Sequence, residues 1–141
     1  MNKRKIRDIG RLTFSLLFFG LYIPHIFLYL FKNSLRKSIN ADLERRKEKN
    51  EVRMNKCLMF LYYIHTDRYF RNLFYHRVGA VVGALIGWWR LGDRSFVISK
   101  TTKIGEGAYF AHPFACEINA KSIGKNFSCR HLTTLGLSLI H

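Results

Sequence analysis

"KIGEGAYFAHPFACEINAKSIGKNFSCRHLTTLG", residues 103–136, shows a spacing of apolar side chains that neither an α-helix nor a flat strand produces. An α-helix brings every third or fourth residue to one face, and a strand brings every second one. Beginning at residue 98, apolar residues stand six positions apart, with one extra residue after the fourth: Ile98, Ile104, Phe110, Cys116, Ile123, Cys129 and Leu135. A period of six predicts a parallel β-helix, in which each unit supplies a short strand and a corner.

Glycines and asparagines stand where this repeat requires corners. Gly105 and Gly124 each follow an inward-facing isoleucine, and glycine adopts backbone conformations that a Cβ atom forbids. Asn119 and Asn126 tolerate a left-handed backbone better than most residues, so we expect them at other corners. These residues support the β-helix prediction independently of the apolar spacing.

The chain of 141 residues is strongly basic, with 24 Lys and Arg against 9 Asp and Glu and a formal net charge of +15. A hydrophobic content of 48%, with 15% aromatic residues, excludes a disordered chain. The positive charge is compatible with a solvated surface, an anionic membrane surface, nucleic acid or a phosphorylated ligand. Because the basic residues are not interleaved with a recognised nucleic-acid-binding motif, we expect no nucleic-acid partner.

The three cysteines, Cys57, Cys116 and Cys129, contain no CxxC pair and are odd in number. This spacing predicts neither a metal site nor a disulfide framework. Cysteines of this kind fit a reducing compartment, so the predicted location is cytoplasmic.

Residues 12–31 form an apolar stretch of 20 positions without a charged residue, flanked by basic residues on both sides. The stretch is long enough to span a bilayer, although Pro24 interrupts a helix at its middle. No small-residue cleavage site follows, which argues against a secretory signal. Two interpretations stay open: a pair of short buried helices that meet at Pro24, or a segment that inserts into a membrane or lies at its surface.

Helical patterns occupy the middle of the chain. Residues 38–56 are highly charged and lack Gly and Pro, which predicts an exposed helix capped by Ser38 or Asn40. Apolar residues then recur at spacings of three and four, with Asp67 expected to start a second helix. The glycines at every fourth position can allow two helices to approach closely: Gly79, Gly83 and Gly87.

The motifs KIGEGAYFAHPFACEINAKSIGKNFSC and LTTLG, preceded by FRNLFYHRVG, resemble the hexapeptide-repeat acyltransferases, and among them the bacterial serine acetyltransferase-like group. The resemblance covers roughly residues 55–136. It implies a helical N-terminal domain that leads into a left-handed parallel β-helix, assembled as trimers or paired trimers. It also implies acetyl-CoA as co-substrate, bound between neighbouring β-helices, and a histidine that deprotonates a small hydroxyl-bearing acceptor.

His112 is the residue that corresponds to the family's catalytic histidine, and no acetyl-CoA-binding residue is carried over. A neutral imidazole can accept a proton from a hydroxyl, whose oxygen then attacks a thioester. The alternative is a histidine that is merely exposed on a β-helix face. Where serine acetyltransferases carry aspartates, this chain has Ala111 and Val97, so the histidine lacks the family's carboxylate partner. A sugar or polysaccharide hydroxyl therefore stays open as the acceptor.

The resemblance ends at Gly136, where the family continues with further coils and a second histidine that neither His131 nor His141 matches. At about eighteen residues per coil, residues 98–136 make about two coils. We therefore expect a C-terminally truncated transferase with impaired activity and most of its acetyl-CoA groove missing. The alternative is a non-catalytic membrane-associated or assembly protein.

These observations predict an α+β chain with a helical N-terminal half followed by a short, incomplete left-handed parallel β-helix. Its predicted parts are an apolar, basic-flanked segment (residues 1–37), a helical region (38–95), a partial hexapeptide-repeat β-helix (96–136) and a tail (137–141).

Overall fold

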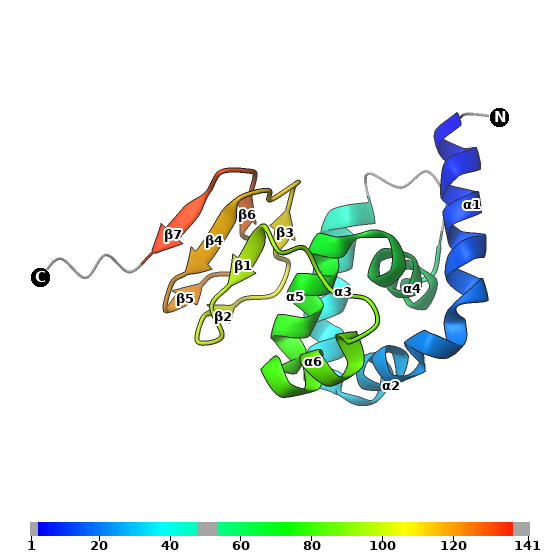
Figure 1. The fold of residues 1–141 in the computed structure, drawn as a ribbon, viewed down its shortest axis with the longest axis horizontal. Coiled ribbons are helices and arrows are strands. Elements are labelled where there is room, and N and C mark those ends of the chain that lie inside the picture. Colours follow the sequence, from blue (N-terminus) through cyan, green and yellow to red (C-terminus); the bar gives the residue numbers. More distant parts are fainter. Residues whose placement is uncertain (1–2, 48–53, 137–141) are drawn as a thin grey trace, which may run out of the picture.

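The structure, a computed structural model, describes residues 3–47 and 54–136. The helices in these ranges are α1 (Lys3–Leu17), the 3-10 helix η1 (Phe19–Tyr22), α2 (Ile23–Phe31), α3 (Asn33–Lys47), α4 (Lys56–Thr66), α5 (Arg68–Val78) and α6 (Ala80–Gly87). The strands are β1 (Phe96–Ile98), β2 (Lys103–Ile104), β3 (Tyr109–Phe110), β4 (Cys116–Asn119), β5 (Ser122–Ile123), β6 (Ser128–Cys129) and β7 (Thr134–Gly136). The helices gather at one end and the strands at the other (Figure 1), which confirms the α+β class. The predicted tail, residues 137–141, lies outside the described residues.

The strands form three parallel sheets, in which each strand pairs with the strand three places later in the chain. The orders are β1-β4-β7, β2-β5 and β3-β6. Paired residues lie 17 to 20 positions apart, as Phe96 with Cys116 and Glu117 with Thr134. The chain therefore winds in coils of about the expected length, and each coil contributes one strand to each sheet.

All seven residues of the six-residue period belong to one hydrophobic cluster between these sheets. Phe110, Cys116, Ile123 and Cys129 are buried in it, and Ile98, Ile104 and Leu135 pack against it partly buried. The period missed Phe96 and Ile118, which are 1% and 0% exposed. They lie in the longer strands β1 and β4, and a strand of three or four residues turns two side chains to the same face.

Close approach of successive coils explains one of the predicted corner glycines. A Cβ atom on Gly105 would lie 2.7 Å from the carbonyl carbon of Gly124, so a larger residue does not fit there. The turn that needs a positive φ is instead at Gly107, with φ of +78°. Asn126 has the expected left-handed backbone, with φ of 57°. The same prediction for Asn119 is wrong, because this residue lies within β4.

The helical core is built largely from aromatic rings. Tyr29 and Phe60 stack with their ring centroids 4.5 Å apart, and Phe74 lies 5.2 Å from Phe60. Asp67 caps α5, as predicted, and its carboxylate accepts hydrogen bonds from two backbone N–H groups. The predicted close helix approach is confirmed where α6 packs on α5: a Cβ atom on Gly83 would lie 2.9 Å from the backbone oxygen of Tyr75.

Helix α3 differs from its prediction at both its start and its exposure. It begins at Asn33, so the predicted caps Ser38 and Asn40 are interior residues. Arg46, one of the basic residues that we expected to face water, is 1% exposed, and Asp42 is 0% exposed. They lie on the same side of the helix as the buried apolar residues of α3, and partners from distant parts of the chain neutralise them. A run of charged letters does not reveal such partners.

An ion pair between Asp42 and Arg77 joins the helices to the strands. Arg77 Nε lies 2.8 Å from Asp42 Oδ2, and Arg77 Nη2 lies 3.0 Å from Oδ1. The same guanidinium donates to the backbone oxygens of Ile104 and Gly105, and the Ala108 N–H donates to Asp42 Oδ1 at 2.8 Å. Burial raises the pKa of Asp42, while the charge of Arg77 opposes that rise. This contact couples α3 and α5 to the first coil.

The N-terminal pair α1 and η1–α2 bends by 75°, with Pro24 in the first turn of α2. The bend lies between Leu17 and Phe19, so the two helices do not meet at Pro24 as predicted, and Pro24 instead stands where η1 gives way to α2. Only one side of the pair is buried, because Leu17 and Phe31 are 75% and 71% exposed. The interpretation as two buried helices therefore holds for the inner side alone. Within the described ranges, no single helix is long and apolar enough to cross a bilayer, although this bent pair passes by length and composition.

Because two histidines are buried, we expect the free energy of unfolding to fall in acid. Burial, reinforced by nearby arginines, lowers the pKa of His25 and of His65 from 6.5 to about 4. Between about pH 4 and 6.5 the unfolded chain therefore binds more protons than the folded chain does. The free energy of unfolding has its full value above about pH 6.5 and decreases towards pH 4. Each histidine accounts for up to about 3 kcal/mol. Urea unfolding at several pH values should show this loss. The variant His65→Gln should lose less free energy of unfolding in acid than the wild-type chain does. An equal loss in both chains would contradict the role of His65.

Candidate functional site

His112 lies at a corner of the first coil, two residues after β3. Its φ is 50°, a left-handed conformation that few residues other than glycine adopt, although histidine is among the more tolerant ones. Its backbone oxygen accepts a hydrogen bond from the Phe114 N–H at 2.7 Å. The side chain is exposed and lines a cleft of about 550 Å³ between the helices and the first coil.

The cleft brings together residues that are far apart in the chain. Helices α1, α3, α4 and α5 contribute to its wall, together with β3 and His112. Its charged residues are five arginines and two aspartates: Arg7, Arg11, Arg46, Arg68, Arg71, Asp8 and Asp67. The excess of positive charge favours a ligand that carries an anionic group.

Arg46 is a buried cation with unused hydrogen-bond donors in the wall of this cleft. Its Nη1 donates to the backbone oxygens of Asp42 and Ala108, at 3.1 and 3.3 Å. The guanidinium carbon lies 5.0 Å from the ring centroid of Phe70 and 5.2 Å from that of Tyr109. Its Nε and Nη2 have no hydrogen-bond partner among the described residues. Because both nitrogens are buried, Arg46 acts on the cleft through its charge.

Asp67 holds its carboxylate at the edge of the cleft by capping α5. Its Oδ1 accepts from the N–H groups of Tyr69 and Phe70, at 2.9 and 3.0 Å. Its Oδ2 lies 3.6 Å from Arg46 Nε, which forms an ion pair without a direct hydrogen bond. The sequence indicated Asp67 only as a helix start, and the structure adds its place beside Arg46.

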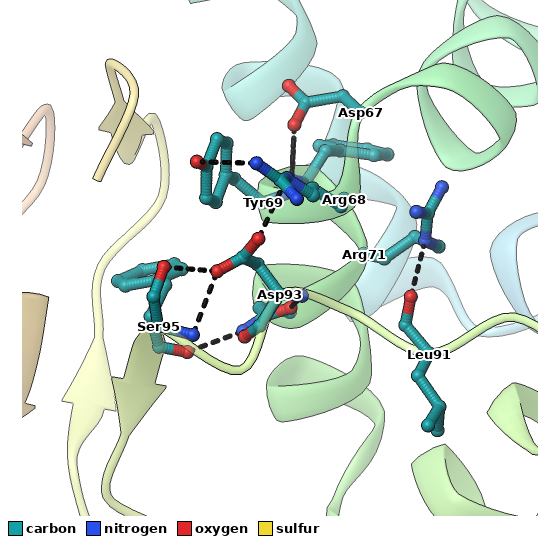
Figure 2. Close-up of polar contacts among 10 residues, drawn as sticks. Asp67, Arg68, Tyr69, Arg71, Leu91, Asp93 and Ser95 are labelled. Carbon is teal, nitrogen blue, oxygen red and sulfur yellow. Dashed lines mark hydrogen bonds and ion pairs between the residues drawn. The ribbon is translucent and has the colours of Figure 1, made fainter. Parts of the chain in front are cut away.

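A second network positions Arg68, on the same turn of α5. Arg68 Nε lies 2.7 Å from Asp93 Oδ2, and the hydroxyl and N–H of Ser95 both donate to Asp93 Oδ1. Figure 2 shows Arg68 between the Tyr69 hydroxyl and Asp93, with Arg71 turned towards Leu91. The loop that leads into β1 is thus attached to the helix that borders the cleft.

Two tyrosines in the cleft wall hold their hydroxyl protons in hydrogen bonds to other residues. Burial raises the pKa of Tyr63 to about 12, and its hydroxyl donates to the Arg46 backbone oxygen at 3.0 Å. Burial also raises the pKa of Tyr62, whose hydroxyl donates to Asp8 Oδ1.

The structure brings His112 to the cleft but supplies no carboxylate partner for it within the described ranges. No side chain there hydrogen-bonds to the His112 ring, and Ala111 and Val97 occupy the positions at which the resembling family carries aspartates. His131, at the corresponding place two residues after β6, is not in the cleft wall. In residues 3–47 and 54–136, no group of three or more His, Cys, Asp or Glu residues could hold a metal ion.

The comparisons with known proteins support a fold assignment. No protein-family model and no curated protein matches the chain. Among solved structures, soybean serine acetyltransferase without ligand aligns with a TM-score of 0.57 and 23% identity over 83% of this chain and 50% of its own. The same enzyme complexed with serine gives 0.56 and 23% over 83% and 51%. Neisseria gonorrhoeae serine acetyltransferase gives 0.53 and 17% over 77% and 44%.

The chain thus spans about half the length of these structures. The alignment covers more than three quarters of this chain in each case, which requires both the helices and the coils. The chain therefore has a serine acetyltransferase-like fold.

Proposed function

We propose that this chain is an O-acyltransferase that moves an acetyl group from acetyl-CoA to a small hydroxyl-bearing acceptor, with His112 as general base. The observation that carries the proposal is the place of His112 at a cationic cleft, in a chain whose fold is similar to that of serine acetyltransferases. Under the same proposal the coils are left-handed and the chain assembles as a trimer or paired trimer, as the resemblance implies.

In the proposed reaction, His112 takes the proton from the acceptor hydroxyl as its oxygen attacks the thioester carbonyl. A new C–O bond forms, the C–S bond breaks, and the CoA thiolate leaves and receives a proton. The exposed imidazole can reach a substrate bound in the cleft. Without a carboxylate to orient it, we expect His112 to be a weaker base than one held by an aspartate.

The charges of the cleft favour an amino-acid acceptor over a neutral sugar. Five arginines against two aspartates leave an excess of positive charge for the carboxylate of an amino acid. A neutral hexose has no anionic group for this excess of positive charge to attract. Serine is an acceptor of the required kind, and a sugar hydroxyl is the second candidate.

Release of CoA thiol by the purified chain tests the proposal directly. We expect saturable release that depends on the acceptor, and faster release with L-serine than with a neutral hexose. Absence of acceptor-dependent release with both compounds would contradict the transferase proposal. Faster release with the hexose would contradict only the choice of acceptor. The control is thiol release without acceptor, which measures simple hydrolysis of the thioester.

A further inference from the structure

Helix α1 turns its apolar side away from the protein. Its buried residues are Asp8 and Ser15, and Asp8 accepts a hydrogen bond from the Tyr62 hydroxyl at 3.0 Å. The opposite side carries large apolar residues that are 40 to 75% exposed: Ile6, Ile9, Leu16 and Leu17. A surface helix of a soluble domain normally buries its apolar stripe and exposes its polar one. Helix α1 therefore leaves its apolar side without a partner among the described residues.

Helix α2 continues the same kind of surface. Its exposed residues follow the helical spacing i, i+4, i+7 and i+8, with exposures of 40 to 71%: Ile23, Phe27, Leu30 and Phe31. Residues four and seven apart share one face of a helix. We call the exposed apolar residues of α1 and α2 the outer face. Figure 1 shows these two helices at the end of the molecule away from the strands.

Basic residues flank the outer face on both sides. Residues 3–37 contain eight lysines and arginines: Lys3, Arg4, Lys5, Arg7, Arg11, Lys32, Arg36 and Lys37. The acidic residue of this segment, Asp8, is buried and hydrogen-bonded to Tyr62. The exposed charge around the outer face is therefore positive. Apolar helix faces with basic flanks bind the interface of anionic membranes, where each basic residue strengthens binding about five-fold.

We propose that the outer face docks on an anionic lipid membrane, with α1 and α2 lying in the headgroup region. The helices lie on the membrane and do not cross it, because crossing would take Asp8 away from Tyr62 and place the polar side of α1 in hydrocarbon. Docking leaves this polar side on the helical core and the cleft residues Arg7 and Arg11 beside the headgroups.

A second copy of this chain fits the outer face less well than lipid does. Pairing two outer faces would bring the eight basic residues of one copy towards the eight of the other. These like charges repel each other, which disfavours pairing through the outer face in particular. An anionic bilayer supplies both the apolar phase and the opposite charge.

Co-sedimentation of the purified chain with lipid vesicles tests the proposal. We expect binding to phosphatidylcholine vesicles that contain phosphatidylglycerol, little binding to phosphatidylcholine alone, and weaker binding at high salt. The double variant Phe27→Ser with Phe31→Ser should bind at least about ten-fold more weakly, because each ring contributes buried apolar area. Lys32→Gln with Lys37→Gln should weaken binding to the anionic vesicles alone.

The matched control is Phe114→Ser with Leu132→Ser in the strand half. These side chains are 59% and 72% exposed, against 56% and 71% for Phe27 and Phe31. Circular dichroism should show that both double variants keep the wild-type helix content. Absent wild-type binding, or equal loss in both double variants, would overturn the proposal. A second outcome would also overturn it: the wild-type chain does not bind vesicles, and light scattering shows a dimer that Phe27→Ser with Phe31→Ser dissociates.

Discussion

Replacing His112 with asparagine is expected to lower the rate of acetyl transfer by about 10²- to 10⁴-fold, the usual contribution of a general base. Asparagine suits this test because it tolerates the left-handed backbone that His112 adopts, with φ of 50°. It can donate and accept hydrogen bonds but does not take a proton near neutral pH. The variant should keep the fold and lose the base, which initial rates of thiol release will measure.

His131→Asn is the matched control for this variant. His131 is also exposed and lies two residues after β6, as His112 lies two residues after β3. Strands β3 and β6 pair with each other, so the two histidines stand at corresponding corners of successive coils. Because only His112 borders the cleft, His131→Asn should leave the rate unchanged. Equal rates for both variants and the wild-type chain would show that His112 is not the base.

Replacing Asp42 with asparagine is expected to lower the free energy of unfolding by about 3 to 5 kcal/mol. The substitution keeps the shape of the side chain but removes the charge that neutralises Arg77, whose own side chain is only 8% exposed. An uncompensated cation would then remain between α3, α5 and the first coil. Urea denaturation followed by circular dichroism will measure the loss. We expect the midpoint to fall while the slope stays the same.

The control for Asp42→Asn is Glu106→Gln, which removes an ion pair of similar length at the surface. Lys125 Nζ lies 2.7 Å from Glu106 Oε1, and the Lys125 side chain is 70% exposed. Water and salt screen such a pair, so its loss should leave the unfolding midpoint unchanged. If both variants unfold alike, the contact between Asp42 and Arg77 does not hold the helices to the strands.

The coils could be predicted because apolar residues recur every six positions, and this spacing depends only on residues that are close in the chain. Each six-residue unit must turn one apolar residue into the interior of the coil. Seven positions in the sequence therefore follow the same spacing. The place of His112 followed from the motif around it, and the start of α5 followed from Asp67, whose side chain caps the N–H groups beside it. Local chemistry therefore suffices for the repeat, the helix start and the candidate base.

The cleft and the outer face depended on contacts between distant segments. The sequence predicted that Arg46 faces water. The structure buries it because α3 packs beside Ala108, which lies 62 residues later in the chain. The apolar stretch 12–31 was compatible with burial or with a membrane, because composition does not say which side of a helix meets the protein. The hydrogen bond from Tyr62 to Asp8 turns the polar side of α1 inwards and leaves its apolar side outside. Sequence periodicity defines the faces of an element, whereas the partners of each face are chosen by packing.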